Sequence, residues 1–251
     1  MKFLKRKDVR AALLIIAVGL IVVAKHDKSV RQARDSRLSD YVINPGTQQL
    51  DFYWKDGSGK NYADFTTLRD SLESQGKELV FAVNGGMYNK ERGPQGLYIE
   101  KGVTLAEIDT DEGGGGNFYL RPNGVFYLTE SGKASIKTTD DFKASKNIKY
   151  ATQSGPMLLI RGKVHPKFTR GSENLNIRNG VGILPDGKIL FSIANEPINF
   201  YDFALHFKNH GCKNALYLDG FVSQTYLPLQ KRMQPGHDFG VIIAESIAGG
   251  K

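Results

Sequence analysis

The sequence predicts an α+β fold: a β-rich single domain with few helices packed on a mixed sheet, preceded by an N-terminal signal or anchor segment. The composition, with 40% hydrophobic residues, 24% charged residues and 28 glycines, is typical of a globular protein. Short apolar runs alternate with turn residues over most of the chain, which indicates strands. Only two segments have apolar residues at helical spacing.

Residues 1–24 have the pattern of a signal peptide or an N-terminal membrane anchor. Five basic side chains and one acid in Met1–Arg10 precede the apolar run from Ala11 to Ala24. The run is shorter than the roughly 20 residues of a bilayer span, and it fits the length of a secretory hydrophobic region. We therefore expect an exported protein, either released after cleavage or retained by the N-terminal segment as an anchor.

The next segment, 25–44, is charged and poor in large apolar residues, so we expect a polar linker and a folded domain over 45–251. The basic N-terminus supplies half of the formal net charge of +8. The remainder has no dense stripe of Lys and Arg with interleaved aromatics, so no nucleic-acid partner is expected. Membrane contact is expected only through an uncleaved N-terminal segment. The single cysteine, Cys212, excludes an intramolecular disulfide.

Short apolar runs bounded by turn residues predict the strands of the domain. They are QQLDFYW, ELVFAV, GLYIEKG, NFYLRPNGVFYL, ATQSGPMLLIRGK, VGILPDGKILFSIA and NALYL. Two places have Pro-Asn-Gly or Pro-Asp-Gly between apolar runs, which is the composition of a tight turn. The segments LRPNGVFYL and ILPDGKILF are therefore predicted to be hairpins.

Two segments are predicted to be helices. DFTTLRDSLESQG has apolar residues on one face, Asp64 as a candidate N-cap and Gly76 as a stop. NFYDFALHFKNHG has the same organisation, with Asn199 before it and Gly211 after it.

Polar residues follow three of the predicted strands directly. ELVFAV runs into Asn84, NALYL into Asp219, and KILFSIA into Asn195 and Glu196. If KILFSIA, the second helix and NALYL form a right-handed crossover, the two strands are parallel and Glu196 and Asp219 lie at one edge of the sheet. Ligands bind at such edges. Ordinary turn chemistry is the alternative for each residue taken alone.

Five segments occur in the order and spacing of a known family. They are FAVNGGMY…GPQGLYIEKG, GGGGNFYLRPNGVFYL, YATQSGPMLLI, IRNGVGILPDGKILFSIANEPINFYDFALHF and GCKNALYLDGFVSQTYLP. Over residues 45–245 the chain thereby resembles the phosphodiester glycosidase family, in particular its bacterial branch. The lysosomal uncovering enzymes of that family hydrolyse an N-acetylglucosamine 1-phosphodiester.

The resemblance implies an exported hydrolase that cleaves a sugar-phosphate diester or a related glycoside in the cell envelope, without a cofactor. The expected partner is then a sugar-phosphate or glycan substrate. The alternative is a non-catalytic glycan-binding protein of the envelope on the same scaffold. It rests on one departure from the uncovering enzymes, because Phe221 and Val222 stand where those enzymes have further glycines.

The resemblance also implies a set of substrate-binding residues, which are polar or glycine positions in the family's short motifs. In chain order they are Asn84, Gly85, Gly86, Ser154, Gly155, Arg178, Asn179 and Ser223. Glycines at such positions let backbone N–H groups approach a ligand closely. Tyr88, beside the first motif, is expected to stack on a sugar face.

Asp219, in the Leu-Asp-Gly motif, is the predicted catalytic carboxylate, and Glu196 is the predicted second one. Hydrolysis at an anomeric carbon passes through an oxocarbenium-like transition state, which a nearby carboxylate stabilises as nucleophile, base or point charge. A phosphodiester leaves readily, so a cation that holds the departing anion is more useful than a strong acid. Arg178 suits that task because its guanidinium binds two phosphate oxygens; the alternative for Arg178 is a solvated hairpin tip.

Two other patterns in the sequence could indicate a zinc site or a serine hydrolase. His206 and His210 have the spacing of a helical zinc pair, with Cys212 close behind, but favourable placement at a helix C-terminus explains them better. No metal site is therefore predicted. Ser154 and Ser223 lie outside any Gly-x-Ser-x-Gly motif, which argues against a serine hydrolase.

Overall fold

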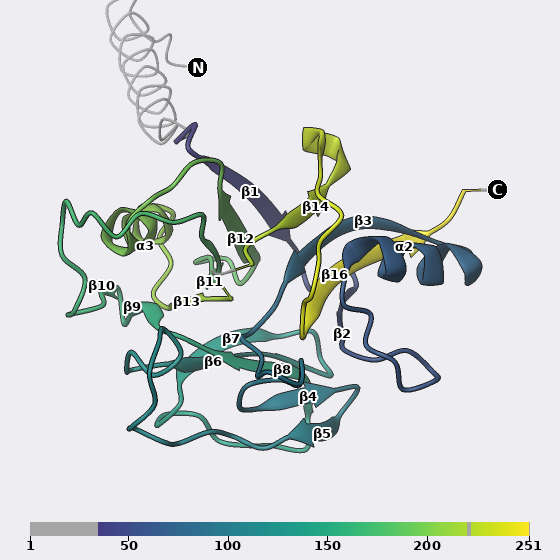
Figure 1. Ribbon diagram of the computed structural model, residues 1–251, viewed down its shortest axis with the longest axis horizontal. Helices are drawn as coiled ribbons and strands as arrows, with labels where there is room; N and C mark the ends of the chain where they lie inside the picture. The colour runs from purple at the N-terminus through teal and green to yellow at the C-terminus, as the bar shows by residue number, and fades with distance from the viewer. Residues whose placement is uncertain (1–34, 220–221, 251) are drawn as a thin grey trace, which may run out of the picture. The chain divides into compact units, whose positions relative to one another are not determined.

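The computed structural model describes residues 35–219 and 222–250. Residues Arg37–Lys251 form one compact unit, and its described part contains three antiparallel sheets and two α-helices (Figure 1). The predicted signal or anchor segment, 1–24, lies outside the described residues. Within the described ranges, no helix is long and apolar enough to cross a membrane.

The three sheets take their strands from distant parts of the chain. The 6-stranded sheet consists, in spatial order, of β1 (Leu38–Ile43), β12 (Ile189–Ala194), β11 (Asn179–Ile183), β13 (Ala215–Tyr217), β9 (Met157–Ile160) and β10 (Lys163–Val164). One 5-stranded sheet consists of β15 (Arg232–Met233), β14 (Thr225–Leu227), β3 (Lys77–Asn84), β16 (Ile242–Ala248) and β2 (Leu50–Tyr53). The other consists of β5 (Val103–Ala106), β4 (Tyr98–Glu100), β8 (Ile148–Ser154), β6 (Gly124–Thr129) and β7 (Ala134–Thr138).

The described strand pairs are all antiparallel, so the prediction of a mixed sheet is wrong. The predicted crossover is nevertheless present, since β12 leads through α3 (Phe200–Asn209) to a parallel strand, β13. The two strands are not neighbours, because β11 lies between them. Gly180 of β11 pairs with Ser192 on one side and with Tyr217 on the other. β12 and β13 therefore end at the same edge of the sheet, as the crossover required.

Large apolar side chains from all three sheets form a central core. Phe191 of β12 meets Phe81 of β3 and Phe126 of β6, with ring centroids 5.2 and 6.0 Å apart. The helices cover the outer faces of two sheets: α3 packs beside β9 and β10, and α2 (Phe65–Ser74) packs on β3 (Figure 1). Each of these two sheets thus has one face toward the central core and one toward its helix.

Both predicted helices are confirmed, with their caps. The Asp64 carboxylate accepts from the main-chain N–H of Thr67 at 2.6 Å at the start of α2. Asn199 caps α3 in the same way, accepting from the N–H of Asp202 at 2.8 Å. Such bonds satisfy N–H groups that have no partner inside the helix.

Replacing Asp64 with Ala is expected to lower the free energy of unfolding by about 1 kcal/mol, because the cap of α2 is lost. Urea denaturation of both chains measures the difference. Asp70→Ala is the matched control: Asp70 lies inside the same helix, is exposed and pairs only with Arg69 at the surface. Equal effects of the two substitutions would show that the cap is not what stabilises the helix.

One of the two predicted hairpins is confirmed. ILPDGKILF forms the β11–β12 hairpin, with the N–H of Leu184 bonded to the carbonyl of Lys188 at 2.9 Å and Gly187 at a φ of 86°. LRPNGVFYL is not a hairpin, because β6 pairs with β7 and β8 instead. The Asn123 side chain is buried and donates to the carbonyl of Phe118 at 3.1 Å, so Pro-Asn-Gly here closes a loop against the core.

Strand β1 lies inside the range 25–44, where the sequence predicted a linker. Its Leu38 and Ile43 are buried, and the strand pairs along its whole length with β12. Only the two ends of the strand are buried, so its sequence lacks the alternation of apolar and polar residues that indicates a strand. The compact unit therefore starts at Arg37 rather than at 45.

Candidate functional site

Strands from all three sheets end close to the predicted catalytic carboxylate. β3 ends at Asn84, β8 ends at Ser154, and Asp219 follows shortly after the end of β13. Because these strands belong to different sheets, the meeting point is a junction in which loops supply the groups. Polar groups gathered over an apolar base are typical of a ligand site.

Main-chain hydrogen bonds join the three motifs at this junction. The N–H of Asp219 donates to the carbonyl oxygen of Gly85 at 3.0 Å. The N–H of Tyr217 donates to the carbonyl of Pro156 at 3.1 Å, which ties the Ser-Gly-Pro segment to β13. Segments that are far apart in the sequence are thus held as one unit.

A buried amide network holds the loop that carries Asp219. Asn84 Nδ2 donates to the carbonyl oxygen of Asp219 at 2.7 Å. Asn84 Oδ1 accepts from Asn179 Nδ2 at 2.9 Å and from the N–H of Gln224 at 3.0 Å. The Ser223 hydroxyl donates to Asn179 Oδ1 at 3.0 Å. The side chains of Asn84, Asn179 and Ser223 therefore fix both ends of the loop.

The carboxylate of Asp219 acts electrostatically on two tyrosines. Burial raises the pKa of Tyr88, and the negative charges of Asp219 and Asp238 raise it further. Burial raises the pKa of Tyr217 to about 12, with Arg178 opposing the rise and Asp219 adding to it. Both phenols therefore keep their protons at neutral pH, and Tyr88 is available as a hydrogen-bond donor beside the carboxylate.

Arg178 is buried, and its guanidinium donates to acceptors of the protein. Nε donates to the carbonyl of Ile198 at 2.8 Å, Nη2 to that of Asn174 at 2.9 Å, and Nη1 to the Tyr217 hydroxyl at 3.3 Å. The guanidinium also lies 3.6 Å from the ring centroid of Phe200. Burial lowers the pKa of Arg178, but an arginine remains charged at neutral pH. Arg178 is not a solvated hairpin tip, and binding of two phosphate oxygens by its guanidinium would require some of these bonds to rearrange, since most of its five N–H groups already have acceptors.

The glycines of the motifs serve close packing between segments. A Cβ at Gly86 would lie 2.4 Å from atoms of β8, and one at Gly155 would lie 2.6 Å from the side chain of Asn123. The N–H of Gly85 donates to the carbonyl of Val241 at 2.7 Å. Any side chain at these positions would push the three sheets apart at the junction.

The hydroxyl of Ser154 is fully buried at the end of β8. It has no hydrogen-bond partner among the described residues. A buried hydroxyl without a partner costs about 1–3 kcal/mol. A ligand or water that bonded to Ser154 would remove this cost.

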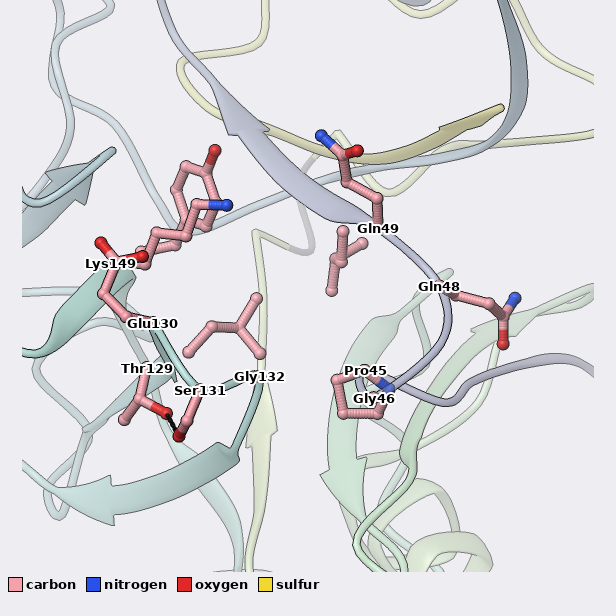
Figure 2. A pocket seen from close by; sticks show the side chains of 12 residues that line it. Pro45, Gly46, Gln48, Gln49, Thr129, Glu130, Ser131, Gly132 and Lys149 are labelled. Carbon is pink, nitrogen blue, oxygen red and sulfur yellow. Dashed lines mark hydrogen bonds between the residues drawn. The ribbon is translucent and has the colours of Figure 1, made fainter. Parts of the chain in front are cut away.

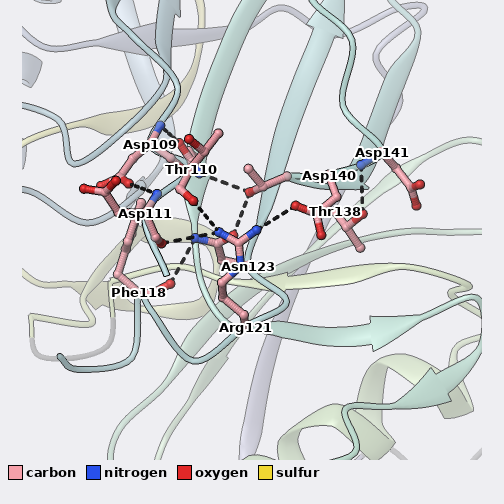
Figure 3. Close-up of polar contacts among 11 residues, drawn as sticks. Asp109, Thr110, Asp111, Phe118, Arg121, Asn123, Thr138, Asp140 and Asp141 are labelled. Atoms are coloured by element: carbon pink, nitrogen blue, oxygen red, sulfur yellow. Dashed lines mark hydrogen bonds and ion pairs between the residues drawn. The ribbon is translucent and has the colours of Figure 1, made fainter. Parts of the chain in front are cut away.

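The residue before Ser154 anchors a polar cluster next to the junction. The Gln153 side chain accepts from the N–H of Asp109 at 2.9 Å and donates to the Asp109 carbonyl at 2.7 Å. Beside it, Arg121 donates to the carbonyl of Thr110 at 3.1 Å and to Asp140 at 2.6 Å (Figure 3). Gln153 thus ties the residues before the exposed glycine run 113–116 to β8, and Arg121 ties the residues after this run to those before it.

The structure does not bring Glu196 to Asp219 by any described contact. Glu196 follows β12 at the predicted edge but is exposed, and no described residue forms a hydrogen bond or ion pair with it. Of the two bulky residues that depart from the family, Phe221 lies outside the described residues. Val222 is buried in the apolar cluster of Phe65 and Leu68, so its side chain packs in the core beneath α2.

The sequence analysis did not identify three residues that contribute to the junction. Tyr217 bonds to Arg178, Gln153 anchors the polar cluster, and Gln224 donates to Asn84 through its main chain. Tyr217 looked like an ordinary strand residue in NALYL, and no local pattern distinguished the two glutamines. Their roles depend on contacts between distant segments.

A pocket of about 290 Å³ lies away from this junction (Figure 2). Its lining includes Pro45, Gln48, Glu130 and Lys149, and none of the predicted site residues. Among the described residues, the group of side chains close enough to share a metal ion is likewise elsewhere, on β1 and α3.

A family profile and a bacterial protein match large parts of this chain in sequence. A family profile described as phosphodiester glycosidase matches residues 77–241. The Escherichia coli (strain K12) protein described as "Uncharacterized protein YigE" is 38% identical over 203 residues, which is 78% of this chain and 79% of that protein.

Solved structures share the fold at low sequence identity. The catalytic domain of zebrafish N-acetylglucosamine-1-phosphodiester alpha-N-acetylglucosaminidase, auto-inhibited by its pro-peptide, aligns with a TM-score of 0.56 and 14% identity over 88% of this chain and 86% of that one. A hypothetical protein from Synechocystis aligns with a TM-score of 0.50 and 12% identity, covering 84% of this chain and 59% of that one. At such identities these matches show the fold alone.

Proposed function

The chain belongs to the phosphodiester glycosidase family, and from that premise we propose that it hydrolyses glycosyl 1-phosphodiesters. The bond between the anomeric carbon and the phosphate oxygen breaks. Water supplies a hydroxyl to the anomeric carbon and a proton to the other product, so the products are a sugar and a phosphate monoester. The alternative of a glycan-binding protein without turnover is an outcome of the test below.

The observation that carries the proposal is the position of Asp219 at the junction of the three sheets. Asn84 bonds to its main-chain oxygen and Gly85 to its N–H, so a buried framework holds the main chain that carries the carboxylate. A fixed negative charge stabilises an oxocarbenium-like transition state because it needs no reorganisation when positive charge develops. Asp219 is therefore the proposed catalytic carboxylate.

Two further groups suit the substrate. The Tyr88 phenol, kept protonated by burial and by the charge of Asp219, can donate to a sugar hydroxyl or a phosphate oxygen. Ser154 offers a buried hydroxyl that has no other described partner. Glu196 stays a proposal for the second carboxylate, and it requires the exposed segment after β12 to turn toward the substrate.

The proposal also covers the anomeric linkage of the substrate and the place in the cell where the protein acts. The zebrafish relative is described as acting on an alpha-linked N-acetylglucosamine 1-phosphodiester, which makes α-linked amino sugars the first substrates to examine. The basic and apolar residues of 1–24 favour action outside the cytoplasm, in the cell envelope.

The test is the release of reducing sugar and phosphate monoester from paired α- and β-linked sugar 1-phosphodiesters, with N-acetylglucosamine among the sugars. We expect release from one anomer only, because a carboxylate fixed by the framework faces one side of the sugar ring. An Asp219→Asn preparation, purified in parallel, shows whether a contaminating hydrolase is responsible. If no diester is cleaved while anionic glycans bind, the glycan-binding alternative replaces the proposal.

A further inference from the structure

A cluster of three metal-ligating side chains lies between β1 and α3. Asp40 of β1 faces His206 and His210, which lie one turn apart near the C-terminal end of α3. His206 Nε2 lies 2.8 Å from one carboxylate oxygen of Asp40, and His210 Nε2 lies 3.7 Å from the other. The three ligand atoms lie within 4.8 Å of one another. A tetrahedral zinc ion with bonds of about 2.0 Å holds its ligand atoms roughly 3.3 Å apart, so small side-chain rotations would produce that geometry.

The hydrogen bond on the far side of the His210 ring fixes its orientation. His210 Nδ1 lies 2.9 Å from the main-chain oxygen of His206, which can only accept, so Nδ1 carries a proton. In the neutral ring Nε2 then has a lone pair, and this nitrogen lies 3.7 Å from a carboxylate oxygen of Asp40. Two acceptor atoms do not bond to each other, whereas a cation between them would bond to both. Metal-binding histidines typically have this arrangement, with the second ring nitrogen bonded to a carbonyl.

We propose that Asp40, His206 and His210 form a binding site for a divalent transition-metal ion, with Zn²⁺ as the best fit. Two imidazole nitrogens and one carboxylate oxygen are ligands that zinc prefers, and they leave a fourth position open. The side chain of His210 is 35% exposed, so water can reach that position, whereas His206 is 5% exposed and fixed. On binding, the neutral His206 ring gives up its Nε2 proton to water and takes one from water on Nδ1, so that the metal replaces the proton at Nε2.

The neighbouring thiol is not part of this donor set. The Cys212 thiol is buried and is not among the side chains whose ligand atoms lie close enough to share the ion. A thiolate ligand is therefore not expected in the site. Coordination by nitrogen and oxygen alone distinguishes this site from a cysteine-containing structural zinc site.

The proposed ion would connect two elements that are far apart in the chain. Asp40 lies in the first strand of the compact unit, and the histidines lie on the helix that leads to β13 and Asp219. An ion that binds only the folded state stabilises it by mass action. The site thus provides a clamp between β1 and α3 that does not depend on the proposed hydrolysis.

The experiment uses the full chain without a polyhistidine tag, stripped of metal with a chelator and titrated with Zn²⁺ in a calorimeter. We expect one tight site. His210→Asn removes a ligand while keeping a side chain that can bond to the carbonyl of His206, and Asp40→Asn removes the carboxylate. Each is expected to weaken binding by at least about 100-fold. Lys208→Asn on the same helix and Asp186→Asn in the β11–β12 turn are matched controls that should bind like the parent.

A second measurement replaces Zn²⁺ with Co²⁺, whose visible absorption reports the coordination. Bands of a tetrahedral site without a thiolate-to-metal transition are expected, and His210→Asn should lose them. Circular dichroism confirms that each variant is folded, which separates loss of the site from loss of the fold. Absence of binding to the parent, or binding unchanged in both ligand variants, would overturn the proposal.

Discussion

Asp219→Asn is expected to lower kcat for a sugar 1-phosphodiester by about 10²- to 10³-fold while KM changes little. The substitution removes the negative charge that opposes the developing oxocarbenium ion, and losses of this size follow when one fixed electrostatic group is removed. The main-chain bonds of residue 219 to Gly85 and Asn84 do not involve the carboxylate and are retained. Initial rates over a range of substrate concentrations separate the two constants.

Asp186→Asn is the matched control for this substitution. Asp186 is an exposed acid in the β11–β12 turn and pairs with Lys188 at the surface. It should leave kcat and KM unchanged, because an exposed pair far from the junction contributes little. An Asp219→Asn enzyme with the parent's kcat would contradict the catalytic assignment, and one with a raised KM alone would make Asp219 a binding residue.

The sequence predicted the local elements of this fold and the edge at which Asp219 lies. Helical spacing and caps located α2 and α3, and the crossover argument correctly placed the ends of β12 and β13 at one edge. The prediction of a mixed sheet was wrong because β11, which the predicted hairpin pairs with β12, pairs on its other edge with β13 and so separates the two parallel strands. The residue pattern of a strand does not show which strand pairs with its second edge.

The contacts that build the junction were beyond sequence reasoning because they join distant residues. Asn84 bonds to Asn179 and to Asp219 across sequence separations of 95 and 135 residues. The family motifs identified these residues but not what they contact, and both of these contacts lie within the protein. Likewise, the histidine pair on α3 was visible as spacing, but its third partner, Asp40, is 166 residues from His206.

The surroundings of the Arg178 side chain could not be predicted from the sequence either. The sequence offered phosphate binding or a solvated hairpin tip. The segment containing Asn174 and the start of α3 bury the guanidinium, which excludes the solvated tip, and phosphate binding stays a prediction. The folding of these segments against one another determines the environment of Arg178, and local composition does not record it.

Arg178→Met is expected to lower the free energy of unfolding by about 3 kcal/mol. The substitution removes three hydrogen bonds of a charged donor, to the carbonyls of Ile198 and Asn174 and to the buried Tyr217 hydroxyl, and hydrogen bonds to a charged group contribute about 1.5–3 kcal/mol each. Urea denaturation measures the change. Arg161→Met is the matched control, because the Arg161 side chain is 79% exposed and pairs only with Asp141 at the surface.

Kinetics distinguish positioning by Arg178 from direct phosphate binding. Through Tyr217 the guanidinium holds the end of β13, two residues before Asp219, so Arg178→Lys should lower kcat by the same factor for a phosphodiester and for an uncharged aryl glycoside of the same sugar. A guanidinium that gripped the departing phosphate would instead affect the phosphodiester alone, since the aryl glycoside has no phosphate. A selective rise in KM for the phosphodiester, with unfolding energy unchanged, would therefore return Arg178 to the substrate-binding role that the family motif implied.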